Sequence, residues 1–138
     1  MGSEMCIRDR DLAIVCEVAV AGDYPGIDEK ESQIKVDGGA AITVADAGGR
    51  GLIAQPSVLQ WLKKIADDEK IKYQLEVGEG GTTDAAVIHI TKTGIPCAVV
   101  SVPTRYMHSG VELVSLNDAE EAVKLVTKAL ERVHELSL

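Results

Sequence analysis

The order of apolar and polar positions predicts strands that alternate with helices over residues 11–138. Leu12–Val20 is an almost unbroken apolar and β-branched run, which is typical of a strand buried on both faces in the middle of an α/β sheet. A similar run at Cys97–Val102 predicts a second buried strand. Between these two we expect short strands at Gln33–Val36 and Ala41–Val44.

The rest of the chain divides into helical and alternating segments. Proline favours a helix start because its missing N–H costs nothing in the first turn, and Pro56 stands at such a position. The remaining predicted elements are a helix over Pro56–Glu69, a half-buried strand over Ile71–Val77, a helix over Asp84–Thr93, a loop over Pro103–Gly110, an edge strand over Val111–Val114 and a helix capped by Asn117. This last helix carries an apolar stripe formed by Ala119, Ala122, Val123, Val126, Leu130 and Val133. This alternation predicts an α/β fold, a three-layer sandwich, in one domain.

Composition excludes several classes of protein. The 138 residues suit one domain, and the 46% apolar and 26% charged residues argue against disorder. No apolar run approaches the length of about 18 residues that a transmembrane helix needs. The net charge is -8, and the sequence has no excess of basic residues of the kind that binds nucleic acids. We therefore expect neither a nucleic-acid partner nor binding to an anionic membrane. Three scattered cysteines, Cys6, Cys16 and Cys97, indicate reduced thiols in the cytoplasm.

The first ten residues, MGSEMCIRDR, do not resemble a signal peptide because they have no apolar core. Gly2–Arg10 resemble, in order, the translation of a transposon mosaic-end adapter used for sequencing libraries. We therefore interpret residues 1–10 as an artefact, with a natural N-terminal arm as the alternative. Under this interpretation the natural protein continues upstream of Asp11, and residues 11–138 are a C-terminal fragment.

Glu17 is the first candidate for chemistry. It lies inside the first apolar run, where a carboxylate loses hydration and needs a partner, a proton or a metal ion. A strand end open to solvent, or a salt bridge to another segment, would equally explain an acidic residue here. His108 is the second candidate, because it directly follows a buried strand and α/β sheets bind ligands in such loops. The alternative is an ordinary surface histidine.

A glycine-rich turn, Gly80–Asp84, precedes the predicted helix over Asp84–Thr93. Such turns can hold anions on backbone N–H groups, but this one lacks the lysine and spacing of a phosphate loop. Simple turn-and-cap chemistry is the favoured interpretation. Ser101 and Ser109 lack the GxSxG context of a nucleophile, and Cys97 is expected to be a buried, inert thiol.

Three segments together resemble a known family. They are AIVCEVAVAGDYPG (Ala13–Gly26), KYQLEVGEGGTTDAAVIH (Lys72–His89) and GIPCAVVSVPTRYMHS (Gly94–Ser109). They are similar to the C-terminal part of the TET-type metallo-aminopeptidases, a family that also carries the names glutamyl aminopeptidase and cellulase M. The resemblance covers essentially all of residues 11–138, and PTRYMHS is its most specific segment.

The resemblance implies a cytoplasmic, homo-oligomeric enzyme that uses two divalent metal ions, zinc or cobalt. It also implies that residues 11–138 form the C-terminal part of a zinc-peptidase-like catalytic domain. Glu17 would take the position of an acidic metal ligand, which is often Asp in the family, and His108 that of the histidine ligand to the other metal. Glu is one methylene longer than Asp, which bears on metal spacing and metal choice.

The same resemblance implies that Thr83 and Asp84 lie near the substrate and that Arg105 and Tyr106 shape the floor of the site. It places the general base and the other metal ligands upstream of this chain. We therefore expect the 138-residue chain alone to be inactive, although the complete enzyme would remove N-terminal residues from peptides.

Three other functions stay open at this point: an endoglucanase, a related zinc amidohydrolase, and a non-catalytic interaction domain. Sugar clefts are commonly lined by aromatic side chains and need paired carboxylates. The chain has only one Trp and three Tyr, which argues against the endoglucanase. An interaction domain would be favoured if Glu17 pointed to solvent or paired with a lysine.

Overall fold

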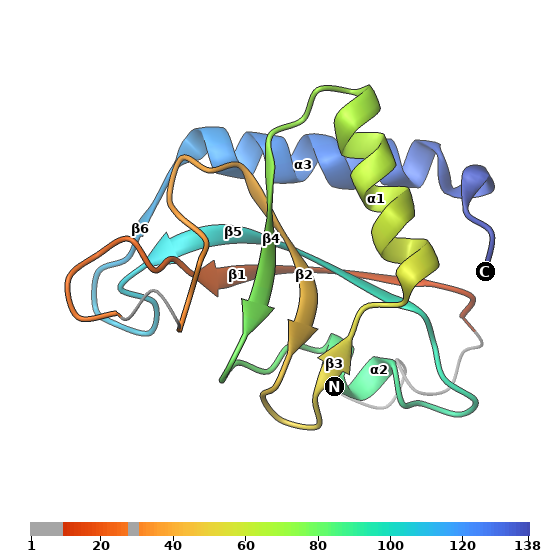
Figure 1. Cartoon of the computed structure of the whole chain (residues 1–138), viewed down its shortest axis with the longest axis horizontal. Helices are drawn as coiled ribbons and strands as arrows, with labels where there is room; N and C mark the ends of the chain where they lie inside the picture. Colours follow the sequence, from red (N-terminus) through yellow and green to blue (C-terminus); the bar gives the residue numbers. More distant parts are fainter. Residues whose placement is uncertain (1–9, 28–30) are drawn as a thin grey trace.

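The computed structural model describes residues 10–27 and 31–138 (Figure 1). Nearly all of the segment interpreted as an adapter, residues 1–9, therefore lies outside the described residues. The strands are β1 (Ala13–Val20), β2 (Ala40–Asp46), β3 (Leu52–Ile53), β4 (Tyr73–Gly78), β5 (Cys97–Arg105) and β6 (Leu113–Val114). The helices are α1 (Pro56–Asp68), α2 (Ala85–Ile88), α3 (Leu116–Glu131) and a 3₁₀ turn, η1 (Val133–Glu135).

The strands form one mixed sheet with the order β1-β5-β2-β3, in which β4 pairs with β2 and β6 with β5. β1 and β5 are parallel, β2 and β4 are parallel, and β2 runs antiparallel to β5. The strands β1 and β5 therefore end at one end of the sheet, and β2 and β4 end at the other. This difference in direction decides which loops can meet.

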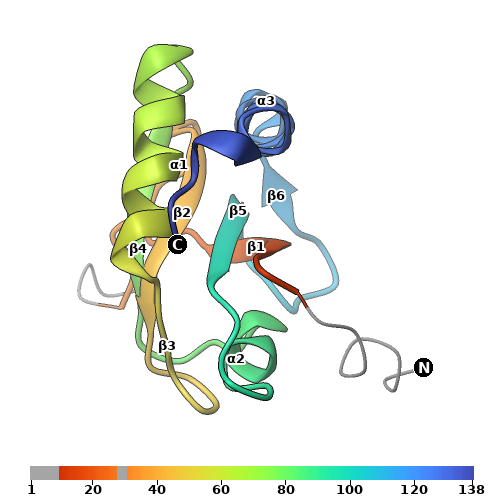
Figure 2. The same cartoon turned by 90° about the vertical axis from the view of Figure 1, so that its right-hand side faces the viewer.

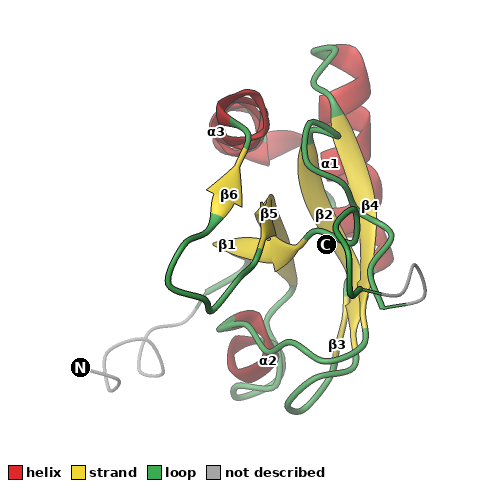
Figure 3. Ribbon diagram, turned by 90° about the vertical axis from the view of Figure 1, so that its left-hand side faces the viewer, coloured by secondary structure: helices red, strands yellow, loops and turns green. Residues whose placement is uncertain are grey.

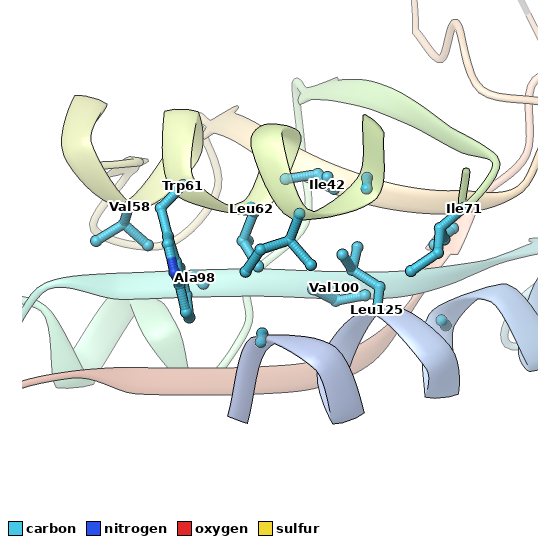
Figure 4. Close-up of a cluster of buried hydrophobic side chains, with 13 residues drawn as sticks. Ile42, Val58, Trp61, Leu62, Ile71, Ala98, Val100 and Leu125 are labelled. Atoms are coloured by element: carbon cyan, nitrogen blue, oxygen red, sulfur yellow. The ribbon is translucent and has the colours of Figure 1, made fainter. Parts of the chain in front are cut away.

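Helices cover both faces of the sheet, as the predicted three-layer α/β sandwich requires (Figure 2). α1 and α3 lie on one face, and the short helix α2 lies on the other (Figure 3). The main core fills the space between α1, α3 and the sheet (Figure 4). Its largest members are Ile42, Val58, Trp61, Leu62, Ile65, Ile71, Val100 and Leu125. A smaller cluster joins α2 to β5 through Ala85, Cys97 and Val99, and Ala13 and Val15 of β1 pack against it.

Helix α1 matches its prediction to within a residue. Pro56 stands in its first turn, and Val58, Leu62 and Ile65 recur at helical spacing and are buried against the sheet. Trp61 is buried on the same helix, and its indole Nε1 donates a hydrogen bond to the backbone oxygen of Arg132, 3.2 Å away. This bond ties α1 to the end of α3.

Among the described residues β1 is not buried on both faces, so the apolar run of Leu12–Val20 is less covered than its pattern alone indicates. β1 stands at the end of the strand order and pairs only with β5 among the described strands. Only Ala19 is fully buried in it, whereas Cys16 is exposed and Val18 is 45% exposed. An apolar run shows that a strand can be buried, but it does not show how many neighbours cover the strand.

Four other predicted elements differ from the structure. The loop predicted over Pro103–Gly110 begins only after Arg105, because Pro103 and Thr104 still pair with β1 and belong to β5. Residues 33–36 form no strand, and the backbone carbonyl of Ile34 instead accepts the N–H of Gly22, 2.9 Å away. The helix predicted over Asp84–Thr93 is only the four residues of α2, followed by turns in which Lys92 adopts a left-handed φ of 55°. The last helix begins at Leu116 after Ser115, so Asn117 lies inside it and does not cap it.

On α3 and β4 the residues that are buried also differ from the predicted apolar faces. On α3 the buried positions are Asp118, Ala122, Leu125 and Ala129. Val123 and Leu130 of the predicted stripe are 67% and 62% exposed. On β4, Leu75 and Val77 are exposed. No helix within residues 10–27 and 31–138 is long and apolar enough to cross a membrane.

The two described cysteines should differ sharply in reactivity. Cys16 is exposed on β1, whereas Cys97 is buried, and burial raises the pKa of the Cys97 thiol to about 11. At pH 8 on the order of 0.1% of Cys97 would then be thiolate, which is the reactive form. In a Cys6→Ser variant we expect Ellman's reagent to titrate one thiol in the native protein and two after unfolding in guanidinium. Equal native rates for both thiols would contradict the burial described here.

Candidate functional site

The carboxylate of Glu17 belongs to a row of side chains that crosses three strands. Glu17 on β1 pairs with Ser101 on β5, which pairs in turn with Ala41 on β2. Residues paired in this way share one face of a sheet, here the face that carries α2. Ser101 is buried and Glu17 is half-buried. Within the described part of the chain, Glu17 makes no salt bridge, so the ion-pair explanation for this residue finds no support there.

His108 lies in the loop that follows β5, at the end of the sheet where β1 also ends. The residue is exposed, and its backbone is left-handed with a φ of 64°. Its backbone N–H donates to Oε1 of Glu112, 2.8 Å away. The structure therefore places Glu17 and His108 on, or directly after, neighbouring parallel strands, although 91 residues separate them in the sequence (108 minus 17).

Carboxylate oxygen and imidazole nitrogen are both ordinary zinc ligands. A zinc site that can do chemistry needs about three protein ligands around the ion. Among residues 10–27 and 31–138 no three or more His, Cys, Asp or Glu side chains are gathered in a way that could hold a metal. Glu17 and His108 thus fit a metal site in type but do not complete one among the described residues.

Arg105 and Tyr106 have protein partners in the loop that follows β1. Arg105 is the last residue of β5, and its guanidinium donates from Nε to Oδ1 of Asp23 at 2.9 Å and from a terminal nitrogen to Oδ2 at 2.6 Å. This hydrogen bond is the main cause that lowers the pKa of Asp23 below its usual range. The rings of Tyr24 and Tyr106 lie with centroids 4.7 Å apart. Sequence reasoning treated Asp23 only as part of a turn.

Thr83 and Asp84 lie in the loop between β4 and α2, which leaves the sheet at the end where β5 begins. The strand directions therefore do not bring them together with the His108 loop. The glycines here have a packing reason, because a Cβ on Gly48 would lie 1.3 Å from the carbonyl oxygen of Gly81. Among the described residues, buried Oγ1 of Thr83 has no hydrogen-bond partner. The close approach of Gly48 to Gly81 supports the turn, but α2 has no side-chain cap hydrogen bond, so the predicted capping by this segment is not formed.

Glu76 is a half-buried carboxylate that sequence reasoning assigned to the polar side of a strand. Thr43 donates from Oγ1 to Oε2 of Glu76 at 2.7 Å. Burial is the main cause that raises the pKa of Glu76, with a further contribution from the charge of Asp46. The folded protein therefore binds a proton on Glu76 more readily than the unfolded chain does.

A Glu76→Gln variant should be more stable than the wild type at pH 7, because burial disfavours the charged carboxylate and the amide carries no charge. The pKa of Glu76 is higher in the folded protein than in the unfolded chain. The wild type therefore loses free energy of unfolding as pH rises from the pKa of the unfolded chain through that of the folded protein, whereas the amide does not ionise. The amide oxygen can still accept the bond from Thr43. Urea unfolding of both proteins should show this difference at pH 7 and a smaller one at pH 4. Exposed Glu79→Gln is the control, and an equal gain in that variant would refute the explanation.

Asp118 is a second carboxylate that sequence reasoning missed. It stands in the first turn of α3 and is only 1% exposed. Its two oxygens accept the backbone N–H groups of Asp37 and Gly39, each at 2.7 Å. These residues form the turn that leads into β2, and both have left-handed backbones. Asp118 therefore fixes the entry of a central strand from about 80 residues away.

Solved structures show the same fold. Among them, an aminopeptidase of the archaeon Desulfurococcus kamchatkensis superposes with a TM-score of 0.80 at 41% identity, over 87% of this chain and 33% of that one. A TET aminopeptidase from a marine sediment archaeon of the Thaumarchaeota has a TM-score of 0.82 at 37% identity, over 88% of this chain and 33% of that one. The mixed α/β fold of this chain is thus one found in aminopeptidases.

The family model of the M42 glutamyl aminopeptidases matches residues 1–125, and the chain belongs to this family. It spans about a third of the length of the first curated relatives that it matches. A structure named as an endoglucanase, from Thermotoga maritima, is also similar, with a TM-score of 0.60 at 28% identity over 86% of this chain and 33% of that one.

Proposed function

We propose that this protein is part of a metal-dependent aminopeptidase, which removes residues from the N-terminus of peptides. The observation that carries the proposal is the parallel pairing of β1 and β5 in a chain of the M42 family. It puts Glu17 and the loop of His108 on adjacent strands that end together. A site between two such strand ends can receive a peptide end from solvent.

In this proposal Glu17 and His108 are ligands to two divalent metal ions, zinc or cobalt. A bound metal pair would polarise the scissile carbonyl and lower the pKa of a bound water. The remaining ligands and the general base are expected outside residues 11–138. The finer assignments also belong to the proposal: a homo-oligomer and a cytoplasmic location. Thr83 and Asp84 stay proposed substrate contacts, but their loop leaves the sheet at the end opposite the His108 loop, so they would contact a part of the peptide away from His108.

The structure changes the proposed part of Arg105 and Tyr106. Both hold protein partners on the β1 loop, since Arg105 binds Asp23 and Tyr106 packs on Tyr24. We keep them at the floor of the site, where they would support the loop that carries His108.

An endoglucanase is the second candidate, supported by the similar structure that carries that name. A glycosidase needs a second carboxylate opposite the first across the sugar bond. The neighbours of Glu17 in its row are Ser101 and Ala41, so this row supplies no such pair. We therefore favour the peptidase.

A chimera tests the proposal. Residues 11–138 would replace the matching third of the aminopeptidase of Desulfurococcus kamchatkensis, and the folded product would be assayed with zinc or cobalt on aminoacyl-nitroanilides and on carboxymethylcellulose. We expect turnover of the nitroanilides alone. A folded, metal-loaded chimera that hydrolyses only the cellulose would overturn the proposal. The 138-residue chain by itself is the control, and we expect no turnover because its described residues complete no metal site.

A further inference from the structure

Two loops leave the same end of the sheet side by side. One follows β1 and the other follows β5, and the ladder between the strands extends one step further through the N–H of Ala21, which donates to the carbonyl of Thr104 at 2.9 Å (Figure 1). The β5 loop carries His108, and the β1 loop carries Asp23 and Tyr24.

The β1 loop has a fixed base. Ser32 donates from its hydroxyl to the carbonyl of Val20 at 2.6 Å, and the N–H of Gly22 donates to the carbonyl of Ile34 at 2.9 Å. The approach is so close that a Cβ on Gly22 would lie 2.1 Å from the carbonyl oxygen of Ser32. Only glycine fits there, so Asp23 is held at a defined place beside the end of β5.

Two contacts join this base to the β5 loop. The first is the two-bond ion pair of Arg105 with Asp23, whose side chains are 30% and 17% exposed. Such parallel, charge-assisted bonds fix orientation as well as distance. The second is the packing of Tyr24 on Tyr106, with ring planes inclined at 56°.

The β5 loop adopts a conformation that needs such support. Tyr106 and His108 are both left-handed, with φ of 60° and 64°. Side chains other than glycine rarely adopt this conformation, and it persists where surrounding contacts determine it. The loop's own bonds are all local: the N–H of Ser109 donates to the carbonyl of Tyr106 at 3.1 Å, that of His108 donates to the exposed Glu112, and the Ser109 hydroxyl donates to the carbonyl of Val111 at 2.7 Å and accepts its N–H at 3.4 Å.

We propose that Asp23 and Arg105 are positioning residues that clamp the β5 loop to the β1 loop and thereby hold His108 in place for metal binding. The metal-binding part rests on the proposed function. The clamp acts through backbone placement, and neither residue needs to touch the metal or the peptide. Tyr24 and Tyr106 extend the clamp to the residue two positions before His108.

Amide exchange in the ¹⁵N-labelled 138-residue chain tests the clamp. The reporters are the N–H groups of His108 and Ser109. In Asp23→Asn and in Arg105→Gln we expect their exchange to speed up about tenfold or more, the size expected when a hydrogen bond to a charged group is lost. The double variant should be no faster than either single variant, because the two residues form one unit.

Glu135→Gln is the matched control, because it removes ion pairs with Lys64 and Arg132 at the far end of α3. It should leave both reporters within a factor of two. Reporter exchange that is unchanged in Asp23→Asn and Arg105→Gln, or raised equally by Glu135→Gln, would overturn the clamp. Should Asp23→Asn fail to fold, Arg105→Lys decides the question, because it keeps the charge but loses the planar fork.

Metal affinity in the chimera tests the link to His108. Arg105→Lys should weaken binding of one of the two metal ions about 10- to 100-fold, as loss of a residue that orients a metal ligand does. Unchanged affinity there would refute the positioning role. The two proposals can fail separately. If the Asp23 and Arg105 variants show faster loop exchange but the unsubstituted chimera has no aminopeptidase activity, the clamp stands and the proposed function is refuted.

Discussion

Replacing His108 with alanine in the chimera should lower aminopeptidase turnover by at least about 100-fold and remove one bound metal equivalent. Loss of residues that merely orient a metal ligand costs 10- to 100-fold, so loss of a ligand itself should cost no less. Glu17→Ala should behave in the same way. Turnover per assembled chimera and metal content by mass spectrometry measure both effects.

Two variants sharpen this prediction. His134→Ala removes an exposed histidine of η1, which belongs to neither loop, and should keep turnover within a factor of two. Glu17→Asp shortens the side chain by one methylene but keeps a carboxylate that can bind a metal ion, so we expect it to retain activity. Full activity in His108→Ala, with both metals still bound, would remove His108 from the site.

Replacing Asp118 with alanine should lower the free energy of unfolding by about 2–4 kcal/mol. The change leaves the N–H groups of Asp37 and Gly39 without acceptors, and each unsatisfied buried donor costs about 1–3 kcal/mol. The turn before β2 also loses the contact that holds its left-handed residues. Urea unfolding followed by the fluorescence of Trp61 measures the loss.

Asp118→Asn keeps one acceptor oxygen in the same place and should lose less stability than the alanine variant. Glu120→Ala, on the exposed side of the same helix, should change stability by no more than about 0.5 kcal/mol. Equal losses in Asp118→Ala and Glu120→Ala would show that the two backbone bonds contribute little.

The elements that could be predicted from the sequence are those whose signal is local and long. The runs that became β1 and β5 and the periodicity of α1 extend over six or more residues, and all three were placed nearly correctly, although β5 continues three residues beyond its predicted end. α2 failed because four residues of helix leave almost no periodicity, and a left-handed Lys92 follows. How far β1 is covered could not be predicted from its apolar run, because hydrophobicity indicates a preference for burial whereas the strand order decides which segments cover the strand.

The residues of the candidate site also differ in how far the sequence could predict them. Glu17 and His108 were found because each is chemically conspicuous in its own segment. The pairing of Asp23 with Arg105 joins residues 82 apart, and Asp118 reaches Gly39 over 79. Neither pair has a local sequence pattern, since an acid in a turn or at a helix start is ordinary. Such contacts exist only once the strands have paired.

The partnership of β1 with β5 also governs how the chain must fold. Ala13 pairs with Cys97, so 84 residues separate the partners (97 minus 13), and parallel pairing over such a distance is slow. Helices α1 and α3 can form early from local contacts, while Leu12–Val20 stays exposed to solvent until it pairs with β5. Exposed apolar segments of this kind aggregate with those of other molecules before folding is complete. Refolding yield should therefore fall as protein concentration rises, and dilute refolding or early capture of this segment should restore it.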